Sequence, residues 1–334
     1  AVPDEEPEEA GEAGAVARDA LIIGLGRDFY YGPEDRTFLH GSTNVWESLV
    51  YLDQNLEAEP WLAEDFFVSE DGLVWTFLLK EGVVFHDGAV MDAEVVRDNL
   101  YRLSRHPGTA QPYSELVEIR VIDNLTVEVE LAVAMPAFPE MISYFPSAIF
   151  SPQVLNEENN GLLAPVGTGP YLFSDHGDDQ IKLTANEGYW GGKPHIEMVV
   201  FQYIPDENTR ISALLAGEVD LLADVGVILP EQVPLLEGNP EIEIMTVDVL
   251  TSIFMHYQAE RRPFDKPELR RAVAMLIDRE ELVSALLDGY GKPAEGFITP
   301  LADFWINPAA APLYNPAEAE AIIAKDRESH QRDL

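Results

Sequence analysis

The stretch PVGTGPYLFSDHGDDQIKLTANEGYWGGKPHIEMVVFQYIPDENTRISALLAGEVDLL, residues 165–222, contains the clearest signals for the fold of this chain. Gly167, Gly169 and Pro170 predict a rigid turn, because glycine gives the backbone freedom and proline fixes φ. A strand is then expected to begin at Tyr171 and to return from Ile181 after a hairpin turn.

The second half of the stretch predicts a strand, a helix and another strand. Val199–Ile204 is an apolar run suited to a buried strand. A helix is expected over Arg210–Ala216, ended by Gly217 and followed by a short strand over Val219–Leu222. The candidates for its N-cap are Asp206, Asn208 and Thr209. Together these elements predict part of a mixed α/β sheet, with chain on both sides of it.

Periodicity predicts further elements outside this stretch. Asn44–Val50 has helical spacing, and Asp92 caps an amphipathic helix that runs to Leu103. The other expected helices are Phe138–Phe145, Pro230–Leu236, Pro267–Ile277, Arg279–Leu287 and Pro316–Lys325. The other expected strands are Ala20–Gly26, Val74–Leu79, Ile119–Ile122, Thr126–Leu131, Ile242–Val247 and Ile253–Gln258.

Length and composition narrow the class of protein. With 334 residues, two or more domains are expected, and no apolar run is long enough for a membrane helix. There are no cysteines, which excludes disulfides, thiolate catalysis and cysteine zinc sites. Residues 1–19 are acidic and lack the apolar region of a signal peptide, so any such segment has been removed and we expect either a disordered tether or the remnant of a tag or linker.

The charge is strongly acidic, with 60 Asp and Glu against 21 Lys and Arg and a net charge of −39. A field of this sign repels nucleic acid and anionic lipid. Abundant carboxylates with few lysines also indicate a salt-rich habitat, where screening removes the self-repulsion. The simpler alternative is an acidic protein without such adaptation.

The sequence contains no complete motif for a catalytic site or for a cofactor site. Gly24-Leu25-Gly26 lacks the third glycine of a dinucleotide site, and neither a P-loop nor a nucleophile elbow is present. His176 lies among aspartates, but aspartate and glycine are ordinary residues of a hairpin turn. We therefore expect no catalytic residue, no metal and no cofactor. A hydrolase that uses two carboxylates stays open as an alternative from another class.

The order of motifs resembles family 5 of the bacterial solute-binding proteins of ABC transporters, which bind oligopeptides, dipeptides, nickel chelates and some sugars. NVWESLV (44–50) to DGLVWTFLLKEGVVFHDG (71–88) resembles the opening block of the family, and PVGTGPY (165–171) is similar to its G-T-G-P-Y/F motif. NEGYWGGKPHIEMVVFQYIPDENTRISALLAGEVDLL (186–222) and PFDKPELRRAVAMLIDREELVSALL (263–287) resemble two further blocks. The likeness covers about residues 20–325.

The resemblance implies a two-lobed periplasmic-binding-protein-like α/β fold with mixed sheets, an extra α+β domain and a hinge, in which ligand sits between the lobes. Lobe I is expected over residues 20–40 and 165–247, and the extra domain over 41–164. Residues 248–334 would begin lobe II. Family members usually continue further, so we expect the second lobe to be incomplete.

The resemblance and the loop positions together suggest residues that contact a ligand. Arg105 is expected to hold a carboxylate, and a surface cation that offsets local acids is its alternative. The aromatic candidates pack either against a ligand or locally. The full set of predicted ligand-binding residues is Phe29, Tyr30, Tyr31, Arg105, Tyr113, Tyr144, Phe145, His256, Tyr257, Phe304 and Trp305.

The function that the resemblance implies is capture of a small peptide outside the cytoplasm and its delivery to an ABC transporter permease. The alternative ligand for the same fold is a metal chelate or a sugar. The alternative function is that of a sensor that passes its bound ligand to a chemoreceptor. We expect a monomer whose only link to a membrane is a lipid anchor that has been removed.

Overall fold

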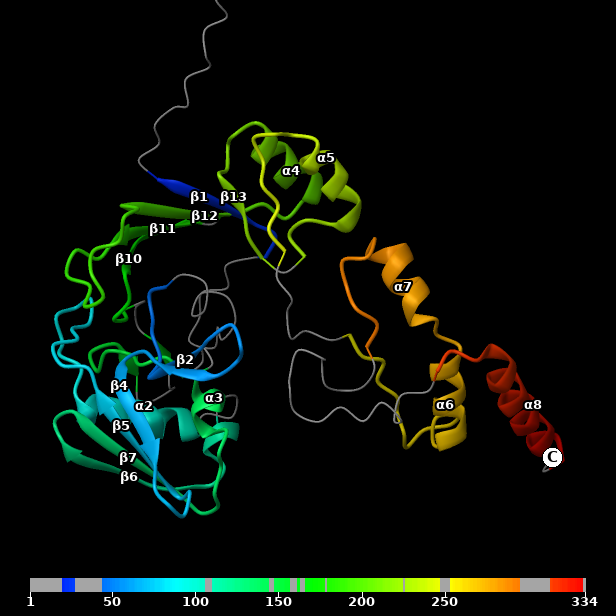
Figure 1. Cartoon of the computed structure of the whole chain (residues 1–334), viewed down its shortest axis with the longest axis horizontal. Coiled ribbons are helices and arrows are strands. Elements are labelled where there is room, and N and C mark those ends of the chain that lie inside the picture. The colour runs from blue at the N-terminus through cyan, green and yellow to red at the C-terminus, as the bar shows by residue number, and fades with distance from the viewer. Residues whose placement is uncertain are drawn as a thin grey trace, which may run out of the picture. The chain divides into compact units, whose positions relative to one another are not determined.

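The computed structural model describes residues 20–27, 44–105, 110–143, 147–156, 161–162, 166–177, 179–224, 226–246, 253–294 and 313–332. The chain divides into two compact units, Ala1–Val227 and Ile228–Leu334 (Figure 1). The domain boundaries expected from the sequence stay a prediction.

The first unit contains a mixed five-stranded sheet in the order β10-β11-β12-β1-β13. Its strands are β1 (Leu21–Leu25), β10 (Tyr171–His176), β11 (Gln180–Ala185), β12 (Met198–Tyr203) and β13 (Leu221–Leu222). β1 is parallel to both β12 and β13, whereas β10, β11 and β12 are antiparallel. The stretch 165–222 therefore supplies four strands, and the strand from the start of the chain inserts between two of them.

The helix α4 (Glu207–Leu215) connects β12 to β13. Of the three candidate N-caps, Asp206 is the one that caps it, since its Oδ1 accepts a hydrogen bond from the Thr209 amide at 2.8 Å. The helix ends at Leu215, and Gly217, two residues later, turns the chain with a φ of 67° that glycine adopts readily. The predicted strand–helix–strand order is therefore confirmed.

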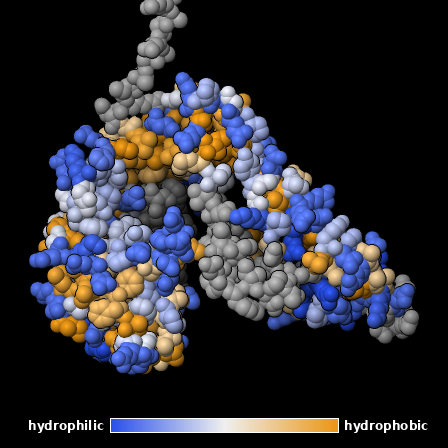
Figure 2. Space-filling model, viewed as in Figure 1, coloured by the Kyte–Doolittle hydropathy of each residue, from blue (hydrophilic) through white to orange (hydrophobic). Residues whose placement is uncertain are grey.

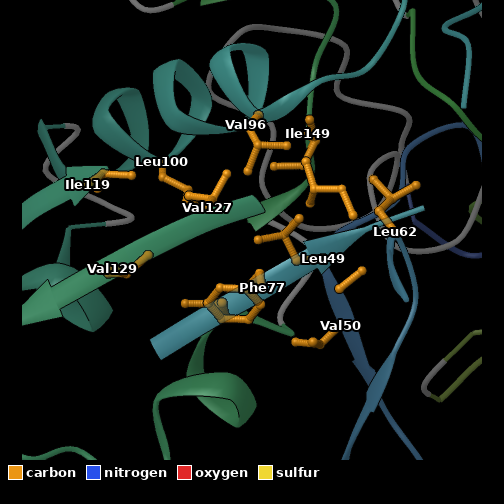
Figure 3. Packing of buried hydrophobic residues seen from close by; sticks show 14 of the residues in the cluster. Leu49, Val50, Leu62, Phe77, Val96, Leu100, Ile119, Val127, Val129 and Ile149 are labelled. Atoms are coloured by element: carbon orange, nitrogen blue, oxygen red, sulfur yellow. The ribbon is translucent and has the colours of Figure 1, made fainter. Parts of the chain in front are cut away.

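A second sheet in this unit is antiparallel and has the order β4-β5-β7-β6. Its strands are β4 (Ala63–Val68), β5 (Val74–Leu79), β6 (Leu116–Asp123) and β7 (Thr126–Leu131). The helix α2 (Ala93–Arg105) covers one face and begins at Asp92, whose Oδ1 accepts from the Val95 amide at 2.9 Å. Figure 3 shows Val96 and Leu100 of α2 pointing toward Val127 of β7 in this core.

Short elements complete the first unit. They are β2 (Val50–Leu52) paired with β3 (Ala58–Pro60), η1 (Gln111–Tyr113), α3 (Phe138–Ile142), and β8 (Leu155–Asn156) paired with β9 (Gly161–Leu162). A second hydrophobic cluster joins the face of the five-stranded sheet to Val45, Trp46 and Phe150.

The helix predicted over Asn44–Val50 is wrong, because this segment runs without helix between the two hydrophobic clusters. Every side chain from Val45 to Val50 is buried, whereas a helix would turn part of them outward. Its carbonyl groups bond to distant backbone instead. Glu47 O accepts from the Ile149 amide at 2.9 Å, and Val45 O accepts from the Gly169 amide at 3.0 Å.

The second unit is helical in the part that the structure describes. Its helices are η3 (Pro230–Gln232), α5 (Val233–Glu237), α6 (Pro267–Met275), α7 (Arg279–Leu286) and α8 (Pro316–Arg332). α6 packs on α8 through Ala272, Met275 and Ala319. Asp278 caps α7 as predicted, since its Oδ1 accepts from the Glu281 amide at 3.0 Å.

The two strands predicted in this unit are wrong where the structure describes them. Residues 242–246 and 253–258 have no regular secondary structure and pair with no strand among the described residues. Ile253 is 89% exposed, so the apolar side chain that the alternating pattern assigned to a core is in contact with solvent. A strand needs the backbone of a partner, and the alternating pattern alone does not supply one.

Candidate functional site

Glu47 is the centre of a buried polar network in the first unit, although it is only 1% exposed. Its Oε2 accepts hydrogen bonds from the Thr168 hydroxyl at 2.7 Å and from the Trp190 indole at 2.9 Å. Its Oε1 accepts from the Tyr189 hydroxyl at 2.6 Å. The ammonium group of Lys80 lies 5.0 Å from the centre of the Trp190 ring. One carboxylate thus ties the opening block of the chain to two later motifs.

The turn Gly167-Thr168-Gly169 packs directly on the segment that contains Glu47. A Cβ on Gly167 would lie 2.0 Å from the Val45 carbonyl oxygen, and one on Gly169 would lie 2.3 Å from the Asn44 carbonyl oxygen. The Gly169 carbonyl is 2.9 Å from Nε2 of His86. Burial lowers the pKa of His86, so the imidazole is neutral and its Nε2–H donates to this carbonyl. Both glycines are therefore required by close backbone contacts, whereas the sequence suggested backbone freedom as the reason.

A cavity of about 330 Å³ opens on the face of the five-stranded sheet. Figure 2 shows hydrophobic residues gathered over this sheet. The residues that line the cavity are Leu21, Ile23, Leu25, Asn44, Tyr171, Leu183, Ile196, Val199, Phe201, Ala223 and Asp224. Most of these side chains are apolar, and Asn44 and Asp224 are the polar exceptions. A mostly apolar cavity with few polar groups is typical of small-molecule sites.

A charged pair stands beside this cavity, where β1 and β13 end. Nε and Nη2 of Arg27 donate to the two carboxylate oxygens of Asp224 at 2.9 and 2.5 Å. The Asp224 side chain is 8% exposed and that of Arg27 is 51% exposed. Ligands of open α/β sheets bind outside the carboxyl ends of the strands, so this edge is placed to meet one.

Arg102 on α2 combines burial with unused donors. Its guanidinium carbon lies 4.6 Å from the centre of the Phe150 ring. Its Nε and Nη2 are buried without a hydrogen-bond partner among the described residues, and so is the hydroxyl of Tyr113. Burial lowers the pKa of Arg102 to about 10 and raises the pKa of Tyr113 above its usual value. Ser147 approaches the Tyr113 hydroxyl without forming a bond of good geometry.

Four of the predicted ligand-binding residues are described by the structure. Arg105 is exposed at the end of α2, with its guanidinium carbon 5.3 Å from the centre of the Tyr101 ring. Tyr113 is buried and packs edge-on against Phe138. In the second unit, His256 is exposed and Tyr257 half-buried.

The other predicted residues lie outside the described part of the chain. They are Phe29, Tyr30, Tyr31, Tyr144, Phe145, Phe304 and Trp305. Of the four described residues, Arg105 ends α2 and Tyr113 lies on the η1 turn, two elements that contact each other, while His256 and Tyr257 are neighbours in the second unit. The ligand-binding roles of the whole set stay a prediction.

Sequence reasoning missed Glu47, Arg102 and the pair Arg27–Asp224. Glu47 lies in NVWESLV (44–50), which indicated only a resemblance to the family. Arg102 is three residues before Arg105 on the same helix, and nothing in the local sequence separates the two. Arg27 and Asp224 are 197 residues apart, so only the sheet reveals their contact.

Two kinds of feature are absent from the described residues. No group of three or more histidine and acidic side chains is arranged to hold a metal ion there. No helix in the same ranges has the length and apolarity that a membrane crossing requires.

Solved structures of binding proteins share this fold. DppA from Helicobacter pylori, a periplasmic binding protein in complex with the peptide STSA, matches with a TM-score of 0.78 at 24% identity, over 92% of this chain and 66% of that one. NikA from Brucella suis in complex with Fe(III)-EDTA matches with a TM-score of 0.76 at 23% identity, over 92% and 64%. The chain therefore shares the fold of these periplasmic binding proteins, which confirms the predicted two-lobed α/β fold. The incomplete second lobe stays a prediction.

Within this class, the chain belongs to family 5 of the bacterial extracellular solute-binding proteins, whose middle-region model matches residues 57–331. The glutathione-binding protein GsiB of Salmonella typhimurium is 30% identical over 319 residues, and GsiB of Escherichia coli K12 is 29% identical. Both alignments cover 92% of this chain, which spans 62% of the length of these relatives. The relatives are binding proteins rather than enzymes, and the extracellular family confirms the predicted extracytoplasmic location.

Proposed function

We propose that the chain is the ligand-capturing part of the solute-binding protein of an ABC importer, and that its ligand is a small peptide. The observation that carries the proposal is membership of family 5 over residues 57–331. A relative at 30% identity binds glutathione, which is itself a tripeptide, and DppA was solved with the peptide STSA. The partner that receives the ligand is the membrane permease of the importer.

The geometry of the first unit supports binding rather than catalysis. The cavity on the five-stranded sheet is mostly apolar, which suits peptide side chains. The carboxylate of Asp224 at its edge is held by Arg27, and that of Glu47 accepts three hydrogen bonds. Both carboxylates are engaged in hydrogen bonds within the protein, so the proposal includes no enzymatic step.

A metal chelate is the second candidate ligand. It is favoured by the similarity in fold to NikA with Fe(III)-EDTA and to NikZ from Campylobacter jejuni with Ni(L-His). A chelate of this kind carries its carboxylates into the site, so the protein needs few metal ligands of its own.

Isothermal titration of the full chain separates the candidates. The injectants are glutathione, a pool of di- to tetrapeptides, and nickel with L-histidine. We expect saturable heat from a peptide and none from nickel–histidine. Heat from nickel–histidine alone would mean that the ligand is a metal chelate and not a peptide. The absence of heat from all three injectants would overturn the proposal. Mass spectrometry of the peptides after incubation should show them intact, and cleavage products would contradict the absence of catalysis.

A further inference from the structure

The side chain of Arg102 lies against an aromatic ring and has one edge without a hydrogen-bond partner among the described residues. Its guanidinium carbon lies over the Phe150 ring, 4.6 Å from the ring centre. Nε and Nη2, which together form one edge of the guanidinium, are buried and have no partner within the described ranges. Burying charged donors without an acceptor is costly, so a native structure that keeps such an edge empty calls for an explanation.

Other arginines of the chain show what this edge normally binds. Arg27 places Nε and Nη2 on the carboxylate of Asp224. Arg120 directs the same two atoms to one oxygen of Glu128, at 3.2 and 3.0 Å. The Nε–Nη2 edge matches the spacing of the two oxygens of a carboxylate.

Composition makes the empty edge unusual. The chain has 60 carboxylate residues for 21 lysines and arginines, so acidic partners are abundant. Arg102 nevertheless has none on this edge among the described residues. A chain of this charge that leaves a buried arginine edge without a carboxylate keeps that edge available for one from outside.

Tyr113 adds a third donor in the same place. Its hydroxyl is buried without a hydrogen-bond partner in the described part, and the residue lies close enough to Arg102 for their charges to interact. Arg102 as a whole is half-buried, so part of the residue reaches solvent, whereas its Nε and Nη2 atoms do not.

We propose that the Nε–Nη2 edge of Arg102 and the hydroxyl of Tyr113 bind a carboxylate group of the ligand. This rests on the proposed function and narrows it to ligands with a free carboxylate, such as the C-terminus of a peptide. It assigns to Arg102 the role that sequence reasoning gave to Arg105.

The first test uses acetate as the probe and does not depend on peptide binding. The melting temperature of the full chain is measured in sodium acetate and in sodium chloride at equal ionic strength. We expect acetate to raise it for wild type and for the matched control Arg97→Gln, because Arg97 on the same helix is half-buried and already pairs with Asp98. Arg102→Gln and Arg102→Met should lose the increase. Equal melting temperatures of wild type in the two salts would overturn the proposal.

The second test compares tri-alanine with its C-terminal amide by titration calorimetry. Wild type should bind the free carboxylate at least about 30-fold more tightly, as expected for a buried charged hydrogen bond. Arg102→Gln should remove this preference while Arg105→Gln retains it. If Arg105→Gln removes it and Arg102→Gln does not, Arg105 binds the carboxylate and the proposal is wrong.

The acetate test and the peptide test distinguish a failure of the Arg102 site from a failure of the proposed function. If tri-alanine does not bind wild type but acetate stabilises it through Arg102, the anion site stands and the peptide proposal fails. Near-ultraviolet circular dichroism of each variant shows whether it is folded. Arg102→Met is the second variant because a long apolar side chain can pack on Phe150 without a charge.

Discussion

Removal of the Glu47 carboxylate should destabilise the first unit more than any exposed acidic substitution. Glu47→Ala would leave the Thr168, Tyr189 and Trp190 donors without an acceptor inside the protein. Each unsatisfied donor costs about 1–3 kcal/mol, and the three costs overlap because the donors share one site. We expect a loss of about 3–5 kcal/mol in the free energy of unfolding.

Glu47→Gln tests the reasoning more finely, because it keeps the shape and one oxygen. The amide oxygen can stay at the position of Oε2, where it still accepts from Thr168 and Trp190. The NH₂ group then faces the Tyr189 hydroxyl, which can turn and accept from it. Only the charge assistance is lost, so the expected cost is about 1–2 kcal/mol.

The assay is urea unfolding at constant salt, followed by tryptophan fluorescence, for wild type and both variants. Glu64→Ala is the matched control, since Glu64 is exposed and should change stability by less than about 0.5 kcal/mol. A Glu47→Ala protein within 1 kcal/mol of wild type would refute the network. So would a Glu47→Gln variant less stable than Glu47→Ala.

Three further predictions concern the turn, a histidine and the charge. Gly167→Ala should cost about 3 kcal/mol or more, because its Cβ would meet the Val45 carbonyl at 2.0 Å, whereas Gly238→Ala, with no neighbour nearer than 3.6 Å, should be nearly neutral in the same urea assay. Burial lowers the pKa of His86 below its ordinary 6.5, so its stabilising effect is complete above pH 6.5 and is lost as the pH falls toward the lowered value. His86→Gln should flatten the fall in urea midpoint between pH 7 and pH 5, and an unchanged slope would contradict this. With a net charge of −39, the melting temperature should be higher in molar potassium chloride than in low salt, and the reverse order would exclude salt adaptation.

Local signals predicted most elements correctly where the structure describes them. Asp206 and Asp278 cap their helices because the cap bond joins residues three apart, so the sequence contains the whole interaction. The alternation in Thr126–Leu131 likewise predicted β7, whose inward residues Val127, Val129 and Leu131 are all buried.

The candidate site was less predictable because its contacts are long-range. Arg102 and Arg105 lie on one helix, yet only Arg102 meets Phe150, which comes from a later part of the chain. The empty edge of Arg102 can be recognised only when the positions of all neighbouring acceptors are known. Arg27 and Asp224 meet because β13 pairs with β1, a pairing that no local pattern specifies.

The stretch 165–222 and the motifs around it determined the family, the α/β class and most of the helices and strands by themselves. These depend on turn chemistry and on periodicity over a few residues. Tertiary structure alone decided that Asn44–Val50 is not helical, because the acceptors and donors of this segment pair with groups up to 143 residues away. It also decided which charged side chains are buried, since burial depends on what the rest of the chain places around them.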